Sequence, residues 1–157
     1  MTTSKQLRVA AIVLAAIALS ACSGIHTYRS GGAAENVTFT PELQTGSVRM
    51  DVYDVDANCK GDYQGSVEPG REAVRIGMPT NQQRFLVVRF EDSSFTSTRI
   101  TKTDLYFMAR PGSTYDIKAS YRDAMYNVVV REQKGGGWHE VPRTTPRECA
   151  SRRKQGG

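Results

Sequence analysis

Polar and apolar residues alternate along much of the chain after its first forty residues. In the segment SVRMDVYDV, the apolar residues Val48, Met50 and Val52 alternate with Arg49 and Asp51. Side chains of a strand point to opposite faces in turn, so this pattern predicts a strand with one buried and one solvent-facing side. The segment STYDIKASY repeats the alternation and predicts a second strand of the same kind.

Other segments are richer in apolar residues, and turn sequences separate them. RFLVVRFE and YNVVVRE predict central strands, while AVRIGM, FTSTRITK, DLYFMAR and WHEVP carry weaker strand patterns. Arg110–Ser113 (RPGS) predicts a type II turn, because Pro fixes the first central φ and Gly accepts a positive φ at the second. No segment of the mature chain has the period of an amphipathic helix. The pattern predicts an all-β fold, a single antiparallel β-sandwich or small barrel of about seven to nine strands.

The chain begins with a basic segment, MTTSKQLR, and continues with an apolar one, 9–21. The apolar segment has the length of a secretory signal and is shorter than the ~20 residues of a spanning helix. It ends in Leu19-Ser20-Ala21-Cys22, which resembles the lipobox of bacterial lipoproteins. The resemblance implies that residues 1–21 are a cleaved signal peptide. The alternative is an ordinary signal peptide cleaved nearby, with an incidental cysteine.

The same resemblance implies a location and a lipid partner. Cys22 would become the first residue of the mature protein, and its acyl chains would bind membrane lipid. In Gram-negative lipoproteins an Asp after the cysteine favours retention in the inner membrane. Here the residue is Ser23. The expected location is therefore the outer membrane, with the domain in the periplasm or, after flipping, on the cell surface.

The formal charge of +5 is concentrated near the two ends of the chain. Removal of the leader takes Lys5 and Arg8 with it, and three further positive charges lie in the closing segment ASRRKQGG. The body between the ends is close to neutral. A basic patch is the usual electrostatic mark of a nucleic-acid-binding domain. We therefore expect no nucleic-acid partner.

Composition divides the mature chain into three parts. Residues 22–36 have little apolar periodicity and contain a Gly pair, so they are expected to form a lipidated, flexible tether. Residues 37–149 carry the strand patterns and are expected to form the β-sandwich. Residues 150–157 have nothing apolar to bury and are expected to be a disordered basic tail.

Cysteine pairing follows from the expected export. With Cys22 acylated, Cys59 and Cys149 remain, and an oxidising envelope favours a disulfide between them. Such a bond would close a loop of about 90 residues, worth roughly 4–5 kcal/mol from chain entropy. The alternative is a pair of free or metal-bound thiols.

One polar cluster has a spacing found in cation sites. It consists of Asp54, Asp56, Asn58 and Asp62. Oxygen ligands at alternate positions can converge on calcium, and the spacing resembles part of an EF-hand loop. However, Cys59 stands where glycine is expected and Gly65 where the bidentate Glu is expected. The alternative is a solvated strand end that leads into a turn, so no metal or other cofactor is assigned.

Sequence motifs give little support to an enzyme. His26 lies in the expected tether, and His139 follows Trp138 after three glycines. The chain has no Gly-x-Ser-x-Gly, His-Glu-x-x-His or phosphate-binding glycine loop. A hydrolase centred on His139 is therefore the least favoured of three hypotheses, and we expect no enzymatic activity.

A set of aromatic residues admits two interpretations. It consists of Tyr106, Phe107, Tyr115, Tyr121 and Tyr126. Such residues fill a core or pair across strands, and they also occur at binding surfaces. Around them, FMARPGSTYDI resembles the strand–Pro-Gly–strand unit of transthyretin-like and carboxypeptidase-regulatory-like modules, which implies a sandwich and no functional residues.

The sequence therefore favours a non-catalytic, lipid-anchored envelope protein. Its expected role is an interaction or assembly-accessory module that binds an envelope protein, with strand addition at a sheet edge as one route. The alternative is a small-ligand or calcium-binding module that uses the loop 54–62.

Overall fold

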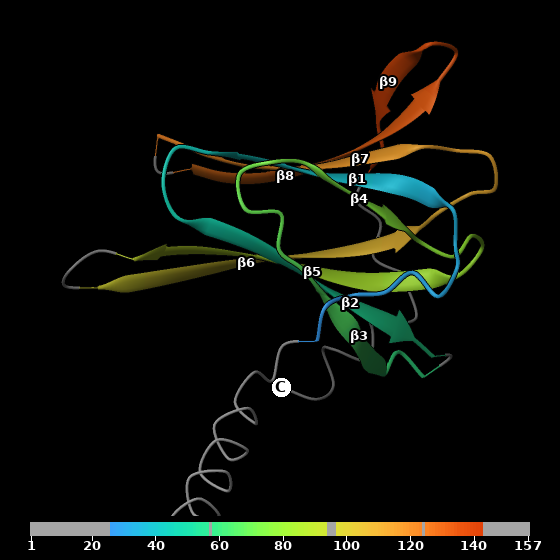
Figure 1. Cartoon of the computed structure of the whole chain (residues 1–157), viewed down its shortest axis with the longest axis horizontal. Helices are drawn as coiled ribbons and strands as arrows, with labels where there is room; N and C mark the ends of the chain where they lie inside the picture. Colours follow the sequence, from blue (N-terminus) through green and yellow to red (C-terminus); the bar gives the residue numbers. More distant parts are fainter. Residues whose placement is uncertain (1–25, 57, 94–96, 124, 143–157) are drawn as a thin grey trace, which may run out of the picture.

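The computed structural model describes residues 26–56, 58–93, 97–123 and 125–142. These residues form nine strands in two sheets. The strands are β1 (Glu35–Leu43), β2 (Ser47–Val55), β3 (Gly61–Val67), β4 (Val74–Gly77), β5 (Gln83–Ser93), β6 (Thr98–Met108), β7 (Tyr115–Arg122), β8 (Met125–Lys134) and β9 (Gly137–Glu140). Figure 1 shows the sheets as two stacked layers, which confirms the predicted β-sandwich.

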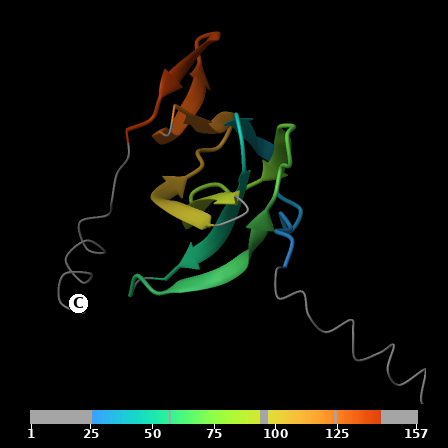
Figure 2. The same ribbon diagram turned by 90° about the vertical axis from the view of Figure 1, so that its left-hand side faces the viewer.

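One sheet has five strands in the order β4-β1-β7-β8-β9, and the other has four in the order β3-β2-β5-β6. Figure 2 shows the two layers after a quarter turn. All neighbouring strands are antiparallel except β1 and β7, which pair in parallel from Val37↔Tyr115 to Leu43↔Tyr121. Alternation along one strand carries no information about the direction of its neighbour, so this parallel pair was not predicted.

The hydrophobic core lies between the sheets. Val48, Met50 and Val52 of β2 are buried there, as the alternation predicted. The other large side chains that are fully buried are Phe39, Phe90, Met78, Leu86, Ile117, Val37, Val88 and Val128. Burial of each such side chain stabilises the fold by about 1.5–3 kcal/mol.

Eight strand segments were predicted. Six of them correspond to one strand each, and the other two lie in the same strand. SVRMDVYDV is β2 with the predicted bounds, and the central segments RFLVVRFE and YNVVVRE lie within β5 and β8. The separate candidates FTSTRITK and DLYFMAR contribute to the single long strand β6. The predicted turn at Arg110–Ser113 is confirmed, because Ser113 N–H donates to the Arg110 carbonyl at 3.2 Å and Gly112 has φ of 74°.

Residues 22–36 were expected to form a flexible tether, but the described part of this segment is packed into the folded domain. β1 begins at Glu35, Tyr28 is buried in the core, and Thr27 forms a parallel bridge with Ser66 of β3. Two main-chain hydrogen bonds hold the segment, from Tyr28 N–H to the Ser66 carbonyl and from Ser66 N–H to the His26 carbonyl. Within the described residues, the folded body therefore begins at His26.

Gly65 makes this docking possible. A Cβ at Gly65 would lie 2.6 Å from the Cα of Tyr28, and the φ of Gly65 is +131°. Any larger residue would collide with the docked main chain. Composition alone showed a Gly-rich segment with no partner, so the docking could not be predicted.

Several predicted features lie outside the described residues. They are the leader 1–21, Cys22, Cys149 and the tail 150–157. Among the residues that are described, no helix has the length and apolar character to cross a membrane.

Candidate functional site

The outer face of the four-stranded sheet carries side chains in cross-strand rows. The register places Tyr53 of β2 opposite Tyr63 of β3 and Phe85 of β5, and Phe85 opposite Tyr106 of β6. We call these four residues the aromatic row. Their ring centroids follow one another at 5.4, 5.9 and 5.0 Å, with tilts of 55°, 49° and 43°.

The aromatic row is partly exposed although it crosses the whole sheet. Tyr63 is 36% exposed, and the other three residues are less exposed but not buried. The core-facing neighbours Val52, Leu86 and Leu105 are buried, so the two faces are well separated. Four adjacent rings give a large contact area whose Tyr members also have polar tips.

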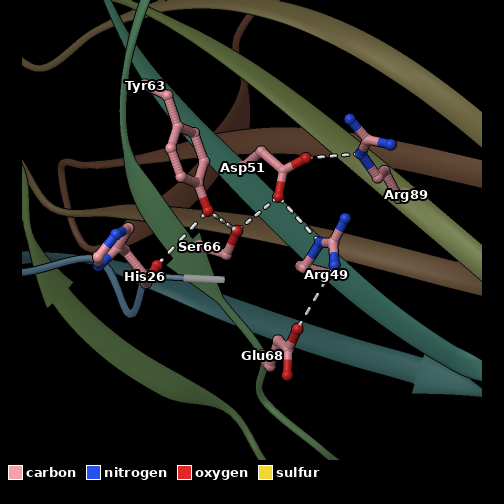
Figure 3. Close-up of polar contacts among 7 residues, drawn as sticks. All are labelled: His26, Arg49, Asp51, Tyr63, Ser66, Glu68 and Arg89. Atoms are coloured by element: carbon pink, nitrogen blue, oxygen red, sulfur yellow. Dashed lines mark hydrogen bonds and ion pairs between the residues drawn. The ribbon is translucent and has the colours of Figure 1, made fainter. Parts of the chain in front are cut away.

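A carboxylate lies beside the aromatic row, between two arginines. Asp51 is 3% exposed although it points to the outer face. Its Oδ2 accepts a hydrogen bond from Arg89 Nε at 2.6 Å, and its Oδ1 lies 2.9 Å from Arg49 Nε. Ser66 Oγ donates to Oδ1 at 2.6 Å. We call Asp51, Arg49, Arg89 and Ser66 the arginine cluster (Figure 3).

Hydrogen bonds connect the arginine cluster to the aromatic row and to the start of the body. Because Ser66 Oγ donates to Asp51, the Tyr63 hydroxyl donates to Ser66 Oγ at 2.7 Å, and it also lies 3.5 Å from the His26 carbonyl oxygen (Figure 3). Burial alone would lower the pKa of the Arg89 guanidinium. The hydrogen bond and charge of Asp51, with a contribution from Tyr53, outweigh burial and raise that pKa.

A shallow hollow of about 250 Å³ adjoins the arginine cluster. Arg49 and Arg89 line it together with Glu68, Glu91 and Ile100. Arg49 Nη1 lies 3.8 Å from Glu68 Oε1, and the lining of the hollow contains two arginines and two glutamates. The arrangement fits a partner surface with mixed charge better than a single anion.

The outer face of the five-stranded sheet is different in character. There Asp116 accepts a hydrogen bond from Thr40 Oγ1 at 2.6 Å and forms an ion pair with Arg131. Lys118 Nζ lies 2.5 Å from Glu42 Oε1. Asp116 is 5% exposed, so it is a buried carboxylate like Asp51, and Arg131 also lies over the exposed ring of Trp138 at 5.6 Å. The row of four adjacent rings is therefore the feature that singles out the four-stranded sheet as the candidate binding face.

The acidic segment proposed for calcium forms a turn. Asp56 Oδ1 accepts the main-chain N–H groups of Asn58 and Lys60, both at 2.8 Å. Asp54 forms an ion pair with Arg84. Asp62 accepts a hydrogen bond from the Gln64 side chain at 3.0 Å. Among the described residues, no three His, Cys, Asp or Glu side chains gather as a metal site.

The remaining predicted residues are spread over the molecule. Cys59 lies in the β2–β3 turn with φ of 63°, and its predicted partner, Cys149, is outside the described part of the chain, so the disulfide stays a prediction. His26 is exposed at the start of the body. His139 is exposed on β9, opposite Glu132 of β8.

The predicted aromatic set divides between the core and the surface. Phe107 and Tyr115 are buried and meet edge to face at 4.9 Å. Tyr121 and Tyr126 stack at 4.3 Å against the core. Only Tyr106 belongs to the aromatic row.

Sequence reasoning missed most of the candidate face. Asp51 and Arg49 were placed on the solvent face of β2, which is correct, but the burial of Asp51 was not foreseen. Tyr53 follows the same alternation, so its position on the outer face could have been predicted. The position of Tyr63 could not, because two glycines obscure the alternation in β3.

The sequence matches no protein-family model and no curated protein.

Proposed function

We propose that this chain is a non-catalytic lipoprotein of the bacterial outer membrane that binds an envelope protein through the outer face of its four-stranded sheet. The observation that carries the proposal is the aromatic row beside the arginine cluster. Tyr, Phe and Arg are enriched at protein interfaces, where a few such residues supply most of the binding energy. Among the described residues, the outer face of the five-stranded sheet carries Arg131 over the exposed ring of Trp138 at 5.6 Å, but no row of adjacent rings crosses its strands.

The rigidity of the face supports a binding role. Its strands hold the rings in place, so little side-chain freedom is lost when a partner docks. Asp51 fixes both arginines before binding, with contacts of 2.6 and 2.9 Å. Partly exposed guanidinium groups then offer their outer N–H donors to carbonyl or carboxylate oxygens of the partner.

The predicted anchor places this face close to the membrane. Acylated Cys22 is separated from His26 by only Ser23, Gly24 and Ile25. Four residue steps span at most about 14 Å. Because His26 is docked beside Tyr63, the β3 edge stays within that distance of its anchor point. The partner is accordingly an envelope protein that lies at the periplasmic surface of the outer membrane.

Site-specific photocrosslinking in cells tests the proposal. A photoreactive phenylalanine analogue replaces Tyr53, Tyr63 or, as a matched control, Thr38 on the outer face of the five-stranded sheet. We expect one discrete crosslinked envelope protein, different from this chain, from the first two positions and none from Thr38. Phe85→Ala should weaken crosslinking at Tyr53, which it adjoins at 5.9 Å, without loss of the folded domain. Equal crosslinking from Thr38, or none from any position, would contradict the proposal.

A further inference from the structure

The edge of the four-stranded sheet at β6 is open. β6 pairs with β5 over its whole length, from Thr98↔Ser93 to Met108↔Gln83, and no strand of the described residues pairs with its other side. Figure 1 shows β5 and β6 extending together beyond the five-stranded sheet. The opposite edge, β3, carries the bridge between Thr27 and Ser66. An open edge presents main-chain N–H and C=O groups to which another strand can bind.

The sequence of β6, TRITKTDLYFM, is complementary to itself around Thr103. In an antiparallel pair of two β6 strands centred there, Thr103 lies opposite Thr103 of the second copy. Lys102 then lies opposite Asp104 of that copy, and two-fold symmetry repeats the pair. Opposite charges at directly facing positions stabilise a strand pair.

The next pair on the same face is apolar. It joins Ile100, which is 56% exposed, to Tyr106 at the end of the aromatic row. Cβ atoms at facing positions lie about 4.5–5.5 Å apart, so these side chains would cover one another. The pairing therefore buries an exposed apolar residue that nothing in the described chain covers.

Neighbouring registers lack this complementarity. Directly facing residues of an antiparallel pair have their side chains on the same side of the sheet. Because side chains alternate between the two sides along a strand, two identical strands can meet this condition only if the two-fold axis passes through a residue and not between two residues. A centre at Lys102 places two lysines opposite each other, and a centre at Asp104 places two aspartates together. Like charges in direct opposition are destabilising. The charges of β6 thus select Thr103 as the centre.

We propose that β6 pairs antiparallel with β6 of a second copy about a two-fold axis at Thr103, which joins two four-stranded sheets into one continuous sheet. The partner is a copy of this chain, chosen by the Lys102–Asp104 and Ile100–Tyr106 pairs. The interface is isologous, so the assembly closes as a dimer. The dimer carries two aromatic rows on one continuous face.

Charge reversal tests the pairing. The detergent-solubilised full-length protein is measured by analytical ultracentrifugation. We expect the unaltered chain to be a dimer, and Lys102→Glu and Asp104→Lys each to be monomers. An equal mixture of the two variants should form a heterodimer, because every facing pair again has opposite charges. Lys60→Glu, an equal change of charge in the β2–β3 turn, should remain a dimer.

Cysteine crosslinking in the native membrane tests the register. Thr103→Cys should give an oxidised homodimer, because only this residue faces its own copy. Thr101→Cys is the matched control, since it faces Leu105 of the copy and its own counterpart lies about 13 Å away. A monomeric unaltered chain, a dimer that persists in Lys102→Glu, equal crosslinking at Thr101, or a Thr103 crosslink to a different protein would each overturn the proposal.

Discussion

Glu132 is predicted to make the stability of the domain depend on pH. Its side chain is 4% exposed and accepts hydrogen bonds from Ser113 Oγ at 2.8 Å and Tyr115 OH at 3.1 Å. Lys134 Nζ lies 2.7 Å from its Oε2. The hydrogen bond with Lys134 is the largest cause that lowers the pKa of Glu132. With Ser113, Tyr115 and the charge of Lys134, it outweighs burial and lowers that pKa from 4.5 to about 2.

The sign and size follow from linkage between protonation and folding. The folded-state pKa lies below the unfolded value, so the carboxylate contributes its full stabilisation above pH 4.5. That contribution is lost as the pH falls from 4.5 towards about 2. At 1.36 kcal/mol per pKa unit, the full shift would correspond to about 3.4 kcal/mol, and solvent screening of the half-exposed Lys134 reduces the expected contribution to about 1–2 kcal/mol.

The measurement is urea unfolding of the unaltered chain and Glu132→Gln between neutral pH and about pH 2. We expect the variant to be less stable by about 1–2 kcal/mol at neutral pH, and the difference to shrink to near zero at the acid end. Glu140→Gln, an exposed carboxyl on β9, is the control and should change stability little at any pH. A constant gap between Glu132→Gln and the unaltered chain across the range would refute the reasoning.

Four further substitutions test other parts of the structure. Met50→Ala should cost about 2–5 kcal/mol in urea unfolding, because it leaves a cavity between the sheets. Gly65→Ala should displace the segment at Tyr28, seen as faster amide hydrogen exchange at Tyr28, and unchanged exchange there would contradict the steric argument. Asp51→Asn should destabilise the domain by about 2 kcal/mol, because two guanidinium groups lose their shared carboxylate. Asp56→Ala should lower the melting temperature equally with and without calcium, since Asp56 binds main-chain N–H groups; a calcium-dependent difference would instead support the calcium-binding alternative.

The fold class was predictable because period-two alternation survives in most strands. β2 shows this best, since its inward residues Val48, Met50 and Val52 are all buried. β1 has the same alternation around Phe39 but was not among the predicted strands, and it contains Pro41, a residue that is usually excluded from central strands. In the structure β4 pairs with β1 only as far as Phe39, so the missing N–H of Pro41 interrupts no bond with β4.

The candidate face was less predictable because it depends on contacts between strands distant in the chain. Asp51 appears as an ordinary solvent-facing residue in its own segment. Its burial arises from Arg89, 38 residues later, and from Ser66, 15 residues later. Neither distance leaves a local pattern. The acidic segment around Asp56 illustrates the converse, since a local pattern suggested a ligand site and the structure shows a capped turn.

The charge pattern of β6 shows how sequence and fold must be combined to infer an interaction. The sequence alone shows that Lys102 and Asp104 flank Thr103. Charged residues on an edge strand ordinarily prevent pairing with other strands, so the sequence alone does not suggest an interaction. These charges favour pairing only with a strand of the complementary pattern in one register. The topology establishes that β6 is an edge, and the register with β5 establishes that Ile100 and Tyr106 share a face with the charges. The same residues that discourage indiscriminate aggregation therefore favour one partner, a second copy of this chain.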